Sequence, residues 1–454
     1  MKKDYLITGG TVLTVNSAND IWHDGAVLVS GGRIADIGPS AELSVKYAGA
    51  DVIDAAGKAV LPGLVNLHLH SGLIRGTAED MPVFEWLAKH VDPKHRALKE
   101  PEAHAASMLC YAESLLAGTT TVLDMYRYMH RSADAAETLG MRAVLSPYVA
   151  DNPPYLYFES MDKNVRLIEE RHETADGRVH VWIGLEHLAY CTEDAYKQAA
   201  KLAEKYGVGI HTHGEESKRM ARDLHDKFGV WPVELFHRRG ILGPRTVLAH
   251  CVWMEEAELD LLQKTGTSVA HCPVSNLKLA SGISPVAAML ERGINVGIGT
   301  DGVKENNNLD MLEEMKFVPL LQKVSRLDAR VMKAGEVLRM ATMGGAKALG
   351  LDREIGSLEI GKKADIIVVD FKKPHLAPFL TGKYDNIVSN LVYSASGQDV
   401  DTVMVDGKLL VEGKRLLTGN VEAIMADAQQ AVEELLARRE AFVPKEFVFP
   451  SSRL

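Results

Sequence analysis

Histidine or aspartate follows an apolar run at four places in the chain, which is a pattern typical of a metal site. The four segments are His68-Leu69-His70, His211-Thr212-His213, Ala249-His250-Cys251 and Gly299-Thr300-Asp301-Gly302. Because alternate residues of a strand point the same way, His68 and His70 can bind one ion together. A carboxylate at a buried strand end, such as Asp301, needs a partner, and a metal is one. Nitrogen and oxygen ligands with an open position suit zinc, and also iron, manganese or cobalt.

Taken one at a time, these features have ordinary explanations. An isolated pair of histidines is common by chance, and Asp301 could simply cap the next turn. Four strand ends that bring imidazole or carboxylate groups to one rim are harder to dismiss. Glu216, shortly after His213, can reach over the ion and carry a proton from water to a leaving nitrogen. Its neighbour Glu215 is expected to lie in solvent.

The elements that must position these groups alternate between strand and helix over residues 60–350. Strands are expected at 61–69, 119–124, 141–149, 179–187, 206–213, 245–250, 266–272 and 294–300. Eight strand–helix units favour a closed (β/α)₈ TIM barrel, whose catalytic groups lie at the C-terminal ends of the strands. An open doubly wound sheet is the alternative.

Both ends of the chain are rich in short strands separated by glycine turns. Asp406-Gly407, between two apolar runs, predicts a hairpin. We therefore expect an α/β protein with a small β-sandwich domain built from both chain ends. The expected limits are 1–58 and 355–420 for the composite domain, 59–354 for the barrel, and 421–454 for a C-terminal helix and tail.

The composition excludes several classes of function. The 454 residues carry a net charge of −10, which makes a nucleic-acid partner unlikely on electrostatic grounds. No apolar run approaches the roughly 20 residues that span a bilayer. The four cysteines are far apart, which is typical of a reduced compartment. We expect a cytoplasmic homo-oligomer that binds a small-molecule substrate, with no membrane partner.

Several motifs together resemble the amidohydrolase superfamily, in its branch of S-adenosylhomocysteine/methylthioadenosine deaminases and triazine hydrolases (the ATZ/TRZ group). The matching stretches run in order along the chain, at residues 61–70, 73–80, 117–121, 213–216, 249–252, 273–279, 299–302 and 361–365. The resemblance implies a (β/α)₈ barrel with a composite β-sandwich and one divalent metal, zinc being the expected ion.

The resemblance also implies a role for individual residues. The implied metal ligands are His68, His70, His213 and Asp301, with His211 as a further candidate ligand. Glu216 would be the proton shuttle, Asp301 the general base, and His250 the group that polarises the substrate. Binuclear members carry a carboxylated lysine at the end of the fourth strand, where this chain has residues 184–187 and no lysine. One metal is therefore favoured.

Substrate contacts are implied at Trp86, Glu79 and His187. Nucleoside deaminases of this branch have a glutamate after the tryptophan and an arginine after the third strand. In place of the segment with that glutamate, this chain has residues 90–95, which include Lys94 and His95. In place of the segment with that arginine, it has residues 146–148. A smaller ring such as a triazine, pyrimidine or pterin is expected, and S-adenosylhomocysteine and methylthioadenosine are expected to be poor substrates.

The function predicted from the sequence is metal-dependent hydrolysis of a C–N bond in a small planar nitrogen-rich compound, releasing ammonia or an amine. The alternative is hydrolysis of an amide, a phenylurea-like urea or a (thio)carbamate at the same site. A non-catalytic binding protein on this scaffold is a third hypothesis, against which the intact set of metal and proton-transfer residues argues.

Overall fold

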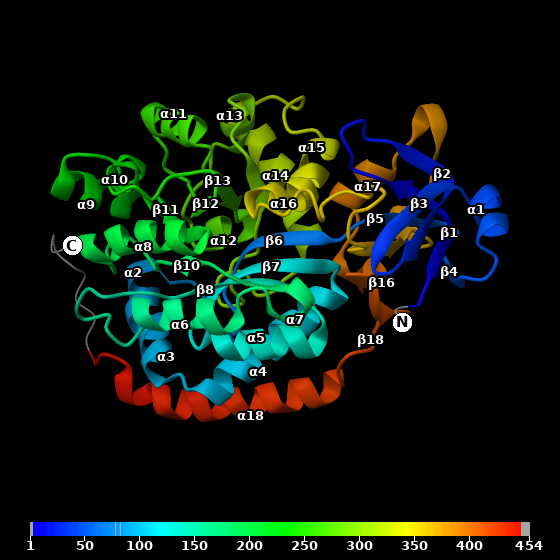
Figure 1. Cartoon of the computed structure of the whole chain (residues 1–454). Helices are drawn as coiled ribbons and strands as arrows, with labels where there is room; N and C mark the ends of the chain where they lie inside the picture. Colours follow the sequence, from blue (N-terminus) through cyan, green and yellow to red (C-terminus); the bar gives the residue numbers. More distant parts are fainter. Residues whose placement is uncertain (1–2, 78, 82, 446–454) are drawn as a thin grey trace.

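Eight parallel strands form a closed barrel in the computed structural model, which describes residues 3–77, 79–81 and 83–445 (Figure 1). The strands are β6 (Leu64–Leu69), β7 (Thr119–Tyr126), β8 (Arg142–Pro147), β9 (Val179–Val181) continued by β10 (Ile183–Gly184), β11 (Ile210–Gly214), β12 (Thr246–His250), β13 (Ser268–His271) and β14 (Val296–Ile298). All but one of their residues are buried, as expected of parallel strands covered by helices. The predicted (β/α)₈ barrel is confirmed.

The barrel is closed at two seams. At the first, Trp182 separates β9 from β10, so the strand pairs with β8 on one side and with β11 on the other. At the second, β14 returns to β6, and the amide of Asp301 donates to the carbonyl of His68 over 3.0 Å. The second seam therefore brings the segments after the first and last strands into direct contact.

Helices cover the outside of the barrel. They include α4 (Glu100–Leu116), α5 (Met129–Leu139), α6 (Met161–Arg171), α8 (Glu193–Tyr206), α9 (Lys218–Phe228), α10 (Pro232–Arg238), α11 (Glu256–Thr265), α12 (Pro273–Lys278), α13 (Val286–Glu291), α14 (Met311–Arg326), α15 (Ala334–Arg339) and α16 (Gly345–Ala348). Several begin at a side chain that accepts from the third helical amide, such as Thr192 before α8 and Ser217 before α9. The same two helices end at glycines with positive φ, Gly207 and Gly229.

A second domain consists of one nine-stranded sheet that uses both ends of the chain. Its strands are β1 (Tyr5–Leu13), β2 (Ile21–Ser30), β3 (Arg33–Pro39), β4 (Asp51–Asp54), β5 (Lys58–Pro62), β15 (Ile366–Asp370), β16 (Val400–Val405), β17 (Lys408–Glu412) and β18 (Arg415–Leu416). Since β5 pairs with both β1 and β15, this sheet continues past the predicted limit of residue 58 to Pro62. Gly63 then connects it to the barrel, where a Cβ would lie 2.1 Å from Thr120 Oγ1.

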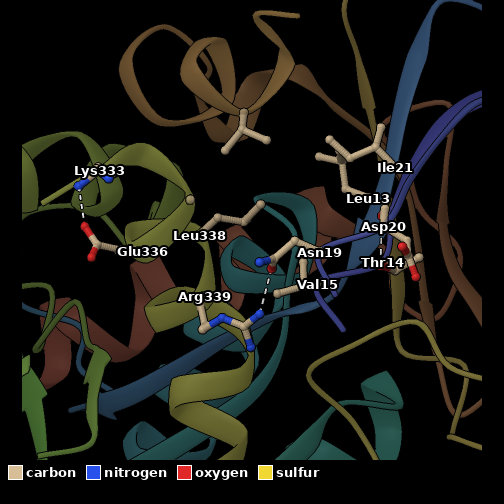
Figure 2. A pocket seen from close by; sticks show the side chains of 12 residues that line it. Leu13, Thr14, Val15, Asn19, Asp20, Ile21, Lys333, Glu336, Leu338 and Arg339 are labelled. Atoms are coloured by element: carbon tan, nitrogen blue, oxygen red, sulfur yellow. Dashed lines mark hydrogen bonds between the residues drawn. The ribbon is translucent and has the colours of Figure 1, made fainter. Parts of the chain in front are cut away.

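A buried ion pair holds the two domains together. Arg142, the first residue of β8, donates from Nε and Nη2 to the two carboxylate oxygens of Asp365 over 3.0 and 2.9 Å. Asp365 also accepts from the amide of Asp406. Elsewhere between the two domains, a hollow of about 380 Å³ lies between β1, β2 and α15, where Arg339 donates to Asn19 (Figure 2).

Three helical segments close one side of the barrel. They are α2 (Val83–Trp86), a π-helical turn (Leu87–Val91) and α3 (Asp92–Ala97). The long C-terminal helix α18 (Val421–Arg439) packs against α3 and α4, along the bottom of Figure 1. Arg439 donates to the carbonyl of Lys89 and contacts His90, which ties this helix to the segment over the barrel. Within the described part of the chain, no helix combines the length and apolarity needed to cross a membrane.

Candidate active site

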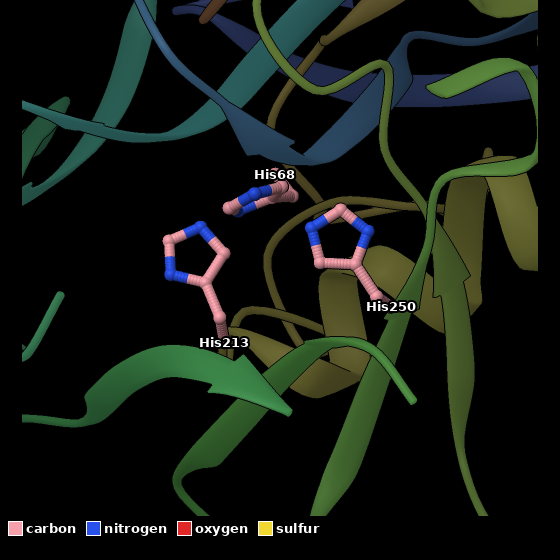
Figure 3. A group of neighbouring side chains, drawn as sticks. All are labelled: His68, His213 and His250. Carbon is pink, nitrogen blue, oxygen red and sulfur yellow. The ribbon is translucent and has the colours of Figure 1, made fainter. Parts of the chain in front are cut away.

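The predicted histidines and aspartate converge at the C-terminal end of the barrel. His68 lies in β6, His213 in β11 and His250 at the end of β12, and Figure 3 shows their rings turned toward one another. His70 follows β6, and Asp301 follows β14. The atoms of His68, His70 and Asp301, and those of His68, His213 and His250, form two overlapping groups whose spacing suits a metal ion.

The hydrogen bonds of His70 and His213 determine which ring nitrogens are free. His70 Nδ1 lies 2.7 Å from the carbonyl of Met125, and His213 Nδ1 contacts the carbonyl of Glu186. A carbonyl can only accept, so each Nδ1 carries the proton and each Nε2 keeps a lone pair. These two Nε2 atoms lie 3.2 Å apart, an arrangement of two acceptors that requires a cation between them.

His68 reaches the same state through a relay. His211 donates from Nδ1 to the carbonyl of Val247, so its Nε2 accepts from His68 Nδ1 over 2.8 Å. His68 Nε2 is therefore a lone pair, and it has no hydrogen-bond partner among the described residues. This geometry corrects the prediction that His211 is a further candidate ligand. Both ring nitrogens of His211 form hydrogen bonds behind His68, so His211 orients a ligand and does not face the ion.

Asp301 supplies the oxygen of the cluster. Its Oδ1 lies 3.4 Å from His68 Nε2 and 3.2 Å from His70 Nε2. Two atoms that bind one tetrahedral zinc at 2.0–2.1 Å lie roughly 3.3 Å apart, so these spacings fit such an ion. Ser275 donates to Oδ2 over 2.6 Å and so fixes the carboxylate. The donor set fits a divalent metal.

The electrostatics of the cluster favour the protonation states that metal binding needs. Burial lowers the pKa values of His68, His70 and His213, which keeps the imidazoles neutral. Burial opposes ionisation of Asp301, but the close approach of His68 and His70 holds its pKa well below the usual range. The cluster therefore offers neutral nitrogens and an ionised oxygen.

Glu216 lies beside the cluster, and His250 belongs to the group with His68 and His213 but not to the group with His70 and Asp301. Burial raises the pKa of Glu216, and the nearby His250 opposes that rise. Ser281 donates to Glu216 Oε1 over 3.5 Å. His250 Nδ1 lies 3.0 Å from Asn276 Oδ1, and its Nε2 lies 3.8 Å from Asp301 Oδ2. A carboxyl whose pKa is raised beside the site is suited to carry a proton to a substrate.

A small cavity of about 60 Å³ lies over the cluster. It is lined by Glu216, His250 and Asp301, and by two of the three predicted substrate contacts, Trp86 and His187. The third, Glu79, does not line this cavity, since its carboxylate pairs with Lys278 over 2.8 Å, and its role as a substrate contact stays a prediction.

Three further predictions need correction. Glu215 is 4% exposed and not in solvent, and burial beside the Glu258 carboxyl raises its pKa. Lys94 and His95, predicted to replace groups that hold ribose, do not line the cavity. His95 lies behind the cavity wall, with its ring centroid 5.3 Å from that of Tyr148. Both side chains are buried, so their identity alone cannot decide what the cavity binds.

Lys304, Glu305 and Glu186 also line the cavity, and none of them was predicted from the sequence. Lys304 and Glu305 follow Asp301 in the loop after the last strand, and that position was the available signal. Tyr148, whose hydroxyl lies 2.9 Å from His70 Nδ1, also lines the cavity. Because His70 Nδ1 donates to Met125, the tyrosine oxygen accepts there, and its own proton is directed elsewhere.

Comparison with known proteins agrees with this fold and site. The model of the amidohydrolase family matches residues 59–410, and that of a bacterial imidazolonepropionase-like composite domain matches 25–50. A 5'-deoxyadenosine deaminase of Methanosarcina acetivorans is 40% identical over 96% of this chain and 100% of its own length. A 5-methylthioadenosine/S-adenosylhomocysteine deaminase of Pelotomaculum thermopropionicum is 39% identical over 95% and 99%.

Solved structures give the same result. An adenosine deaminase from Xanthomonas campestris with bound zinc aligns with a TM-score of 0.90 and 32% identity, over 96% of this chain and 99% of that one. A triazine hydrolase from Arthrobacter aurescens aligns with a TM-score of 0.86 and 26% identity, over 95% and 99%.

Fold, donor set and relatives define a class: a metal-dependent hydrolase that cleaves C–N bonds other than peptide bonds. Within that class, the chain belongs to the amidohydrolase family. The enzyme class and the superfamily predicted from the sequence are therefore confirmed.

Proposed function

We propose that this enzyme hydrolytically deaminates a small planar amino heterocycle and releases ammonia. In this reaction, a water oxygen bonds to the ring carbon, the bond from that carbon to the amino nitrogen breaks, and the nitrogen leaves with the protons of ammonia. The observation that carries the proposal is the convergence of three histidine lone pairs and the Asp301 carboxylate beside Glu216, whose carboxyl pKa is raised by burial.

A single zinc ion is the proposed occupant, held by His68, His70, His213 and Asp301. When bound, a divalent ion supplies Lewis acidity that makes water acidic near neutral pH. The zinc named for the solved relative supports this choice over iron, manganese or cobalt. The hydrogen bonds of His70 to Met125 and of His68 to His211 leave Nε2 lone pairs for a divalent ion, without selecting among these metals.

The roles of the flanking residues follow from their positions. Asp301 accepts a proton from the attacking water at its carboxylate, which Ser275 holds in place. His250 hydrogen-bonds the charge that develops at the reacting carbon's heteroatom. Glu216 delivers a proton to the departing nitrogen, which turns a poor leaving group into ammonia.

A small ring is proposed in preference to a nucleoside. The cavity of about 60 Å³ is far below the roughly 300–1,000 Å³ typical of small-molecule pockets. Among its described lining residues no arginine is available for an amino-acid carboxylate. The relatives are named for 5'-deoxyadenosine and for methylthioadenosine and S-adenosylhomocysteine, so these nucleosides are the competing substrates.

The test is a substrate screen on protein loaded with zinc. Aminated pyrimidines, purines, pterins and triazines, the three nucleosides, and a phenylurea and a thiocarbamate are assayed for ammonia and for organic amine. We expect ammonia from a free ring and low kcat/KM for the nucleosides. Efficient turnover of a nucleoside would overturn the small-ring proposal, and organic amine from the urea or thiocarbamate would favour the alternative reaction. Bound metal without any turnover would support a binding protein. The predictions of a homo-oligomer and of a cytoplasmic location stay predictions.

A further inference from the structure

A lysine and a glutamate lie side by side on the cavity wall, beyond the residues that carry out the reaction. Lys304 is 8% exposed and Glu305 is 4% exposed. The ammonium of Lys304 contacts Glu305 Oε1 and lies 5.1 Å from the centre of the Trp86 ring, within cation–π range. Burying a charged pair costs free energy, so a buried pair on the wall of a substrate cavity indicates a role in binding the substrate.

The pair leaves an acceptor open. Glu305 Oε2 is buried and has no hydrogen-bond partner among the described residues, as is also true of Glu186 Oε2 and the indole nitrogen of Trp86. All three side chains line the cavity. An unpaired buried acceptor costs about 1–3 kcal/mol, which a substrate N–H would recover.

Gly302 places this acceptor next to the metal cluster. A Cβ at Gly302 would lie 2.4 Å from Glu305 Oε2 and 2.9 Å from the Cβ of His70. The Glu305 carboxylate therefore folds back over the backbone of the ligand segment. A group bound by Glu305 would lie close to the carbon that reacts.

The wall of the cavity places a donor directly beside an acceptor. Its described lining contains the carboxyl groups of Glu186, Glu216, Asp301 and Glu305, and a single ammonium, that of Lys304. Burial lowers the pKa of Lys304 to about 8, and Asp301 and Glu186 oppose that shift, so the ammonium is charged at neutral pH. A ligand with an acceptor next to a donor is complementary to this wall.

We propose that Lys304 and Glu305 bind a lactam edge of the substrate, a ring N–H next to a carbonyl. Lys304 donates to the carbonyl oxygen, and Glu305 accepts from the ring N–H. This inference rests on the proposed deamination and names its substrate class: amino heterocycles in which the carbon that loses nitrogen neighbours a lactam, as in isocytosine and guanine.

Glu79 has a positioning role in this arrangement. It pairs with Lys278, whose ammonium donates to the backbone carbonyl of Lys304 over 3.0 Å and to Asn307 over 2.7 Å. Asn307 donates in turn to Glu79. This network fixes the loop that carries Lys304 and Glu305, so Glu79 would act through that loop without touching the cavity.

The test compares matched rings and matched variants. Isocytosine and 2-aminopyrimidine, and guanine and 2-aminopurine, differ only by the lactam. With zinc-loaded enzyme, we expect kcat/KM to favour each lactam ring by at least roughly 100-fold, because a site built for a polar group rejects the analogue that lacks it. Lys304→Met and Glu305→Gln should reduce that preference to about tenfold or less, mainly through KM. Lys316→Met and Glu422→Gln, at exposed positions on α14 and α18, should leave it unchanged.

Binding measured by calorimetry separates this inference from the proposed function. Isocytosine should bind the zinc-loaded wild type and lose affinity at least tenfold in Lys304→Met, with melting temperature as the check of folding. Selective binding of lactam rings without ammonia release would sustain the inference and refute deamination. Ammonia release without lactam preference, or equal losses on both rings in the variants, would overturn the inference alone. Neither binding nor release would overturn both.

Discussion

Two buried polar centres, at opposite ends of the barrel, differ in whether their polar groups satisfy one another. At the start of β8, the guanidinium of Arg142 is matched by both oxygens of Asp365. At the other end, His68, His70 and Asp301 direct lone pairs at one another. A matched pair satisfies its own hydrogen-bonding needs, so its role is to join the domains. Converging acceptors are satisfied only by a cation, so their burial indicates a function.

Removing a ligand should have the largest effect of the changes that test this contrast. Asp301→Ala loses both the oxygen donor and the proposed base, so we expect metal content to fall from about one ion per chain toward zero and activity to reach background. Metal analysis after dialysis measures the first effect and ammonia release the second. An Asp301→Ala protein with a full complement of metal would contradict the ligand assignment.

Removing the proton donor should reduce kcat by roughly 10²–10⁴ without loss of metal. Glu216→Gln keeps the shape and the contact with Ser281 but cannot give a proton to nitrogen. The raised pKa of Glu216 means that its proton is retained below that pKa and lost above it. The kcat/KM of the wild type should therefore fall as the pH rises through the pKa of Glu216, and the Glu216→Gln variant should not show this decrease. Metal loss equal to that of Asp301→Ala would make Glu216 a ligand instead.

Breaking the ion pair between Arg142 and Asp365 should lower the free energy of unfolding without changing kcat. Arg142→Met leaves the Asp365 carboxylate buried without its partner, which should cost about 3–5 kcal/mol of unfolding free energy. Denaturant unfolding measures this loss. The double variant Arg142→Met/Asp365→Leu should recover most of it, with kcat per folded molecule near that of the wild type. A comparable loss of kcat in folded Arg142→Met would show that the two ends are coupled.

Disturbing the support of a ligand should have the smallest effect. His211→Leu removes the acceptor that holds the His68 tautomer, and loss of such support typically weakens metal affinity by roughly 10–100-fold. Competition with a chelator reports the affinity, and excess zinc should restore activity. His211→Gln, which offers an acceptor oxygen, should retain more affinity than His211→Leu. Unchanged metal affinity in both variants would show that the hydrogen bond between His68 and His211 does not support the metal site.

The site was predictable where chemistry coincides with the end of a strand. His68, His70 and His213 follow apolar runs, and the alternation of strand side chains was enough to bring them to one rim. The same reasoning could not separate His211 from His213, because both lie on one strand and on the same side of it. Only the neighbouring β12, through the carbonyl of Val247, decides that His211 faces inward to His68.

The sequence by itself determined the barrel, the domain built from both chain ends and the residue types of the metal site. These depend on local periodicity and on motifs within a few residues. Tertiary structure alone decided the burial of Glu215, the pairing of Glu79 with Lys278, and the position of Lys304 and Glu305 beside the metal cluster. In each case the partner lies on another element or across a turn, and a one-dimensional pattern carries no information about which side chains a closed barrel brings together.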